Sequence, residues 1–170
     1  VSELSALRVP GSRRTATLAA SGGDGRALAA SPPLASGAQV ELRLVCRVDG
    51  AAPTSGTVAV RTLATAAGSA YTEIGYNFAN QTFYVDHSRC CAAPSPIVQR
   101  APLPAVLLGP SFELHVLVDG GTIEAFLAGV AITALVSPDA SAGAPQARTS
   151  TVVSSVPSAN CSGSSWKLAY

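Results

Sequence analysis

The chain has 170 residues, with 11 basic groups, 10 acidic groups and a formal net charge of +1. Charged residues make up only 12% of it and hydrophobic residues 48%, which argues against intrinsic disorder. A nucleic-acid-binding protein normally carries a basic patch, so we expect no nucleic-acid partner. No apolar run approaches the roughly 20 residues of a membrane-spanning helix, and we expect no membrane association. The length is enough for one globular domain.

Alternating hydrophobic and polar residues predict β-strands along most of the chain. The clearest alternation runs over Val40–Val48, where one set of residues is expected to face a core and the other, including Glu41 and Arg43, to face solvent. In chain order the predicted strands are Arg14–Ala19, Val40–Val48, Thr57–Leu63, Tyr71–Phe78, Thr82–Asp86, Phe112–Asp119, Thr122–Leu127, Val130–Val136, Thr149–Val153 and Ser165–Tyr170.

Glycine and proline separate these runs. Gly129 predicts a tight turn between two strands in a segment that could otherwise form a buried helix. The prolines between Pro94 and Pro104 predict a long irregular crossing, and residues 137–147 predict a loop. Many short strands separated by glycine and proline are typical of an all-β fold, here a two-sheet antiparallel β-sandwich of the jelly-roll or concanavalin A type. We expect residues 1–10 to be a connector and residues 11–170 to be the single sandwich domain.

The sequence contains no catalytic constellation. It has no glycine-rich phosphate loop and no Cys-x-x-Cys pair, and His87 and His115 lack a second ligand at metal-like spacing. We therefore expect no cofactor and no metal. Asp119 and Glu124 flank a hairpin, and paired carboxylates can cleave glycosides when held about 5–9 Å apart in a cleft. On a hairpin we expect them to bond neighbouring backbone and strands, and we predict no catalytic residue.

Several segments resemble, in order and spacing, the C-terminal domains of glycoside hydrolase family 32. Residues 73–76 (EIGY) with 82–89 (TFYVDHSR), and residues 114–126 (LHVLVDGGTIEAF), are similar to the family's "igYd…tlyvDrSrs" and "LrvlvDxSxvExF" segments. Residues 100–103, 131–138 and 1–8 resemble a crossing, a strand and a connector of the same domains. Gly121 departs from the family pattern, which has Ser there. The matched motif positions, which we interpret as structural, are Asp86, Ser88, Arg89, Asp119, Glu124, Phe126 and Thr133.

The resemblance implies a C-terminal module whose catalytic partner is a separate β-propeller domain. The family's catalytic carboxylates lie in propeller motifs such as "NDPNG", "RDP" and "EC", and the chain has none of them. The module is expected to stabilise the propeller and to contribute to the rim of the substrate cleft or to a homo-oligomer. The parent enzyme would hydrolyse β-fructofuranosyl bonds in sucrose or fructan.

Two other interpretations stay open. The chain could be a stand-alone, lectin-like carbohydrate-binding domain with Tyr71, Tyr84 or Trp166 as stacking platforms for fructan or sucrose. It could also be a structural interaction domain without a ligand.

Two further features concern modification and redox state. Asn80 and Asn160 each begin an N-glycosylation sequon, which suggests a secreted, cell-wall or vacuolar protein. Adjacent cysteines rarely pair because their geometry is strained. An oxidised chain would therefore pair one of Cys90 and Cys91 with Cys46 or Cys161, and we expect one disulfide and a buried Cys46 thiol.

Overall fold

The computed structural model describes residues 5–18, 29–90, 98–137 and 148–169. Strands account for most of this part of the chain, and a 3-10 helix, η1 (Ala105–Leu107), precedes β9. No helix among these residues has the length and apolar character needed to cross a bilayer. The strands are β1 (Arg14–Leu18), β2 (Ala29–Ala30), β3 (Ala35–Ser36), β4 (Gln39–Val48), β5 (Thr57–Ala64), β6 (Tyr71–Asn77), β7 (Thr82–Arg89), β8 (Val98–Pro102), β9 (Ser111–Asp119), β10 (Thr122–Leu127), β11 (Val130–Leu135), β12 (Thr149–Ser154) and β13 (Ala159–Lys167).

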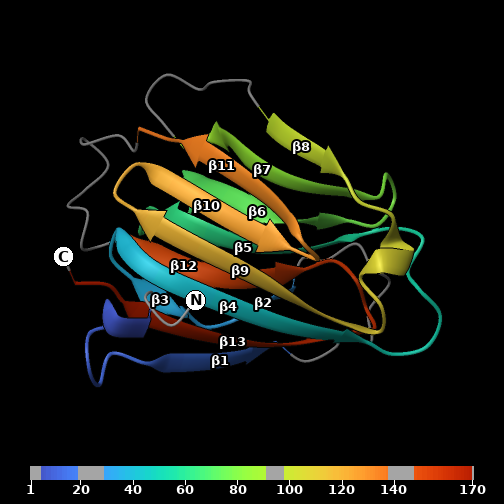
Figure 1. The fold of residues 1–170 in the computed structure, drawn as a ribbon, viewed down its shortest axis with the longest axis horizontal. Helices are drawn as coiled ribbons and strands as arrows, with labels where there is room; N and C mark the ends of the chain where they lie inside the picture. Colours follow the sequence, from blue (N-terminus) through green and yellow to red (C-terminus); the bar gives the residue numbers. More distant parts are fainter. Residues whose placement is uncertain (1–4, 19–28, 91–97, 138–147, 170) are drawn as a thin grey trace.

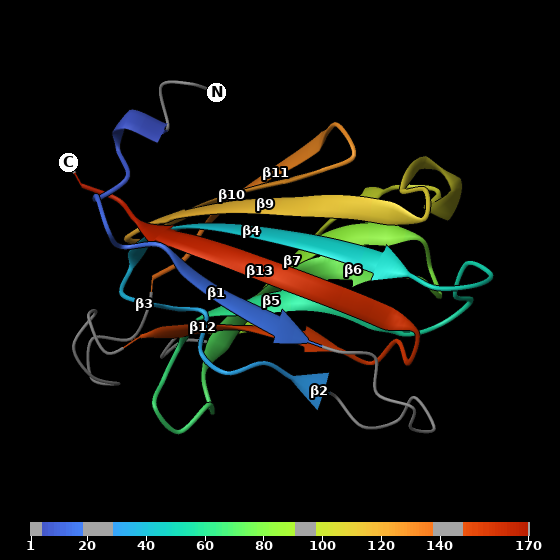
Figure 2. The ribbon, with the colours of Figure 1, turned by 90° about the horizontal axis from the view of Figure 1, so that it is seen from below.

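The strands form two sheets that face each other (Figure 1). Sheet one has the order β1-β13-β4-β9-β10-β11, and sheet two has the order β2-β12-β5-β6-β7-β8, with β3 also paired to β12. Neighbouring strands pair antiparallel throughout. Figure 2 shows the two layers from below. The predicted two-sheet antiparallel β-sandwich is confirmed.

Alternate side chains of the long strands point into the space between the two sheets. Val40, Leu42 and Leu44 of β4 are at most 1% exposed, and Val116 and Val118 of β9 are fully buried. They pack in one core with apolar side chains of sheet two. The predicted inward face of both strands is therefore confirmed.

Two tight hairpins join β9, β10 and β11. Leu127 pairs with Val130, and the two residues of the turn, Ala128 and Gly129, have φ angles of 47° and 81°. Two successive positive φ angles match the right-handed twist of the paired strands. The tight turn predicted at Gly129 is thus present, and the alternative of a buried helix is wrong.

The structure differs most from the predicted strands at β13 and β8. The last strand begins at Ala159 rather than Ser165, because its buried positions are largely small residues such as Gly163 that give no hydrophobic alternation. The proline-rich crossing contains β8, which pairs with β7 at the edge of sheet two, a position where proline is tolerated. Residues 138–147 of the predicted loop lie outside the described residues.

The cysteine prediction is wrong. Cys46 is not a free thiol but is disulfide-bonded to Cys161, with the two Cα atoms 4.1 Å apart. The register of β4 and β13 places these residues directly opposite each other, although 115 positions separate them in sequence. Cys90 is also disulfide-bonded.

The disulfide state can be tested by alkylation. When the chain is unfolded without reductant, Cys46, Cys90 and Cys161 should take up no label, because each is already bonded. Reduction before alkylation should label all three, as peptide mass spectrometry would show. A labelled Cys46 in the unreduced sample would contradict this pairing.

The core assignment of β9 can be tested with Val116→Asp. An unpaired carboxylate at this fully buried position should lower the free energy of unfolding by several kcal/mol, a large part of the about 5–15 kcal/mol typical of a domain. Ser111→Asp is the matched control, because Ser111 lies on the same strand, is exposed and pairs with Arg47. Equal denaturant midpoints for the two variants would refute the assignment.

Candidate interaction face

The outer face of sheet one brings together residues that are far apart in sequence. Across the sheet, Trp166 of β13 pairs with Glu41 of β4, which pairs with Leu117 of β9. Leu117 pairs with Glu124 of β10, which pairs with Thr133 of β11. We call this surface the outer face of sheet one, and it carries the candidate functional residues described below.

Glu41 is the unexpected residue of this face. The alternation of β4 predicts a solvent-facing side chain, yet Glu41 is fully buried. Arg8 donates two hydrogen bonds to its carboxylate, from Nε at 2.7 Å and from Nη2 at 2.8 Å. Nε of Arg43 donates a third at 3.1 Å, and Nε2 of His115 lies 3.0 Å from Oε1. The buried charge is therefore surrounded by basic groups.

These contacts set the protonation states of the cluster. Burial on its own would raise the pKa of Glu41, but the hydrogen bonds from Arg8 and Arg43 outweigh it and the pKa is lowered. Burial and the neighbouring Arg43 lower the pKa of His115. Glu41 is accordingly ionised and His115 neutral near pH 7, so the cluster is held mainly by the two arginines.

Arg8 ties the predicted connector to this face. Its guanidinium also lies over the Trp166 ring, 4.0 Å from the centroid, a cation–π contact. The backbone next to it pairs with the end of the chain, since Val9 N donates to Lys167 O and Ala169 N donates to Leu7 O. In Figure 2 the blue segment before β1 rises beside the strands of sheet one. Residues 7–9 of the predicted connector are thus fixed against this sheet.

Exposed apolar side chains lie on the same face. Val45, Phe126 and Leu135 are 43%, 39% and 77% exposed and project from β4, β10 and β11 on the outward positions. The Phe126 ring lies 5.8 Å from the His115 ring. The face therefore combines charged groups with uncovered apolar surface, a mixture that protein interfaces share.

The motif residues of β9, β10 and β11 also lie on or beside this face. Glu124, Phe126 and Thr133 are exposed on it, and Asp119 at the end of β9 accepts a hydrogen bond from Nε2 of Gln39 at 3.3 Å. Asp119 thus contacts the neighbouring strand β4 through Gln39. Glu124 lies in a different row of the sheet, where it pairs with Leu117.

The remaining motif residues lie on sheet two. Oδ1 of Asp86 accepts a hydrogen bond from the backbone N of Ser88 at 2.9 Å, and the Arg89 guanidinium lies 5.8 Å from the Tyr71 ring. The structure therefore separates the matched motif residues into two groups on opposite sheets. Their structural role stays a prediction.

The three aromatic rings that a lectin would use for sugar stacking already contact other side chains of the chain. Tyr84 is only 7% exposed, and its hydroxyl donates to Glu73 at 2.8 Å; burial and Glu73 together raise the pKa of Tyr84. Arg61 covers the Tyr71 ring at 4.3 Å, as Arg8 covers that of Trp166. These contacts give no support to stacking of a sugar on the three rings.

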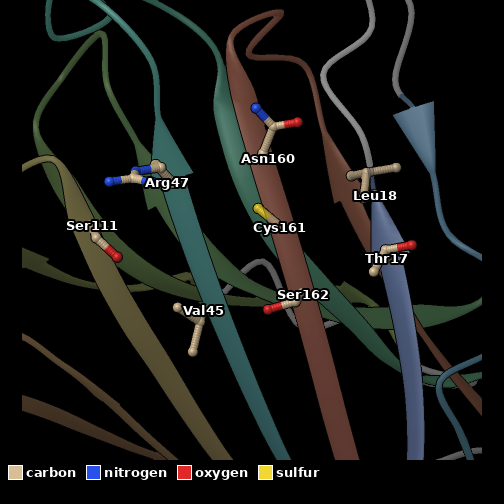
Figure 3. A pocket seen from close by; sticks show the side chains of 8 residues that line it. All are labelled: Thr17, Leu18, Val45, Arg47, Ser111, Asn160, Cys161 and Ser162. Atoms are coloured by element: carbon tan, nitrogen blue, oxygen red, sulfur yellow. The ribbon is translucent and has the colours of Figure 1, made fainter.

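Two cavities border the asparagines of the two sequons, Asn160 and Asn80. The larger, of about 490 Å³, is an open hollow on sheet one between β1, β13 and β4 (Figure 3). A smaller polar one of about 200 Å³ lies on sheet two beside Tyr84 and Arg100. In the described ranges no group of His, Cys, Asp and Glu side chains could hold a metal ion.

Comparisons with known proteins agree with the resemblance. The family profile described as "Glycosyl hydrolases family 32 C terminal" matches residues 3–162. No curated protein sequence matches the chain.

Among solved structures, the chain is similar to part of exo-inulinase from Aspergillus awamori, with 20% identity, a TM-score of 0.70, and coverage of 98% of this chain and 31% of that one. β-Fructofuranosidase from Aspergillus kawachii is 19% identical with a TM-score of 0.74, and the match covers 100% of this chain and 30% of that one. Fructan 1-exohydrolase IIa from Cichorium intybus is 15% identical with a TM-score of 0.68, and the match covers 99% of this chain and 37% of that one. The chain thus spans about a third of the length of these proteins, and the likeness shows a shared fold.

The role of the buried carboxylate can be tested with Glu41→Gln. Because the folded pKa of Glu41 is lowered, its contribution to stability is present above the unfolded pKa of about 4.3 and is lost as pH falls through the folded pKa. The variant should be less stable by about 1–3 kcal/mol near pH 7 and should lose less stability on acidification below about pH 4.3.

Glu124→Gln is the matched control, since Glu124 is exposed in the same row of the sheet and should change stability by less than about 0.5 kcal/mol. Chemical unfolding as a function of pH measures both variants. Parallel acid profiles for Glu41→Gln and the wild type would contradict the assignment.

Proposed function

Because the chain belongs to the family of glycoside hydrolase family 32 C-terminal domains, we propose that it is the non-catalytic β-sandwich module of a β-fructosidase and stabilises a separate catalytic β-propeller. The parent enzyme hydrolyses β-fructofuranosyl bonds of sucrose or fructan. The inulinase, fructofuranosidase and fructan exohydrolase that share the fold support this assignment.

One observation supports the proposal beyond the fold: the segment around Arg8 is held on the outer face of sheet one. Arg8 bonds the buried Glu41 and covers Trp166. A domain joined through this segment would approach the sandwich from the side on which Arg8 lies. The outer face of sheet one is therefore the proposed docking surface for the propeller.

The chemistry of that face suits such a contact. Interfaces between domains of one chain are more polar than permanent subunit interfaces. Phe126 and Leu135 supply apolar area at one edge of the sheet, and Arg43 and Glu113, which form an ion pair at 3.8 Å, supply charge. Covering the two apolar side chains would remove them from water, which is favourable in proportion to the area buried.

The catalytic step is assigned to the partner. The chain has none of the acidic propeller motifs of the family it resembles, and the described carboxylates either bond neighbouring groups, as Asp119 and Glu73 do, or lie on open sheet surface. The module then acts through the rigidity and position of the propeller rather than through a reacting group.

The proposal is tested in the full parent enzyme with Phe126→Asp combined with Leu135→Asp. Two carboxylates in the contact should weaken docking by about 1–3 kcal/mol and lower the temperature of half-inactivation, measured by fructose release from sucrose and inulin. The matched control is Val106→Asp with Leu107→Asp, which places the same charges at two other exposed apolar residues, in η1.

Inactivation at the same temperature for both double variants would refute the docking face. Fructose release by the purified 170-residue chain, at a rate unaffected by removing every trace of propeller, would refute the non-catalytic assignment.

A further inference from the structure

The two sequons occupy very different settings, and from this difference we infer that Asn80, and not Asn160, is an N-glycosylation site. The ligand class is an oligosaccharide attached through the side-chain amide nitrogen. The inference is independent of the docking face, because it rests on the local structure around each asparagine.

Asn80 lies at the tip of the turn between β6 and β7. It is exposed, and the turn is held by Oδ1 of Asn77, which accepts from Ala79 N at 2.9 Å. The Thr82 hydroxyl donates to Oδ1 of Asn80, so the two polar residues of the sequon already contact each other. No described residue accepts a hydrogen bond from Nδ2 of Asn80, the atom to which the sugar would be attached.

The surroundings of Asn80 suit a sugar. The side chains of Asn80 and Thr82 line the polar cavity of about 200 Å³ on sheet two, together with Glu73, Asp86 and Arg100. These carboxylates and this guanidinium are the acceptors and donors that sugar hydroxyls require. A bulky glycan on such a surface loop is readily solvated.

Asn160 is also exposed, but it lies within a strand, near the start of β13, where it pairs with β4 in sheet one (Figure 3). Its Nδ2 donates to Oδ2 of Asp49 at 2.8 Å, and its backbone is paired with Arg47. The middle residue of this sequon is Cys161, which is bonded to Cys46. The nitrogen that would carry the sugar is thus engaged, and the sequon is locked in the sheet by a covalent bond.

The transfer needs one co-reactant, an oligosaccharide carried on a lipid pyrophosphate. A bond forms between Nδ2 of Asn80 and the anomeric carbon of the sugar, and the bond from that carbon to the pyrophosphate oxygen breaks. The lipid pyrophosphate leaves with the bonding electron pair, and the amide nitrogen gives up one proton. Nothing is oxidised or reduced.

The test is to secrete the full parent chain from a yeast and to map both sequons by peptide mass spectrometry after enzymatic deglycosylation, which converts each glycosylated asparagine to aspartate. We expect conversion at Asn80 and none at Asn160. Asn80→Gln and Thr82→Ala should each abolish the signal at Asn80, whereas Thr82→Ser, which keeps the sequon, should retain it.

Wild-type occupancy decides the matter even if a variant fails to fold. A chain unmodified at Asn80, or modified at Asn160, would overturn the inference and would leave the docking proposal untouched. Asn160→Gln is the further control and should leave the glycan at Asn80 unchanged.

Discussion

A carboxylate buried on the face of a sheet is the constraint around which sheet one is organised. Removing a charge from water costs several kcal/mol unless partners replace the water, and Glu41 is fully buried. Its partners come from three places: Arg8 before β1, Arg43 on its own strand and His115 on β9. The hydrogen bonds to this one side chain therefore order the segment around Arg8, the centre of the sheet and Trp166, over which Arg8 lies.

The two outer faces consequently differ in character. Sheet one shows uncovered apolar groups such as Phe126 and Leu135 around its buried charge. Sheet two carries a network in which Arg61 and Tyr84 both donate to Glu73, each at 2.8 Å. Apolar area gains free energy from being covered, whereas a satisfied polar network gains little by leaving water. This contrast supports contact with a protein on one face and with solvent or sugars on the other.

The sequence predicted what local patterns determine. The alternation in Val40–Val48 and Phe112–Asp119 identified two central strands with their correct faces, and the order of motifs pointed to the family. The sequence did not predict the features that depend on pairing between distant segments. Neither the Cys46–Cys161 disulfide nor the burial of Glu41 follows from neighbouring residues, because both result from the registers of β13 and β9 against β4.

The strand order also has a consequence for biosynthesis. β13 lies between β1 and β4, and β12 lies between β2 and β5, so each sheet receives an internal strand that is translated after both of its neighbours. Until residues 149–167 leave the ribosome, β1 and β4 have no strand to join them, and Cys46 lacks its disulfide partner. The module is thus completed late, and a prematurely terminated product would expose unpaired strand edges and apolar surface, the features that favour aggregation.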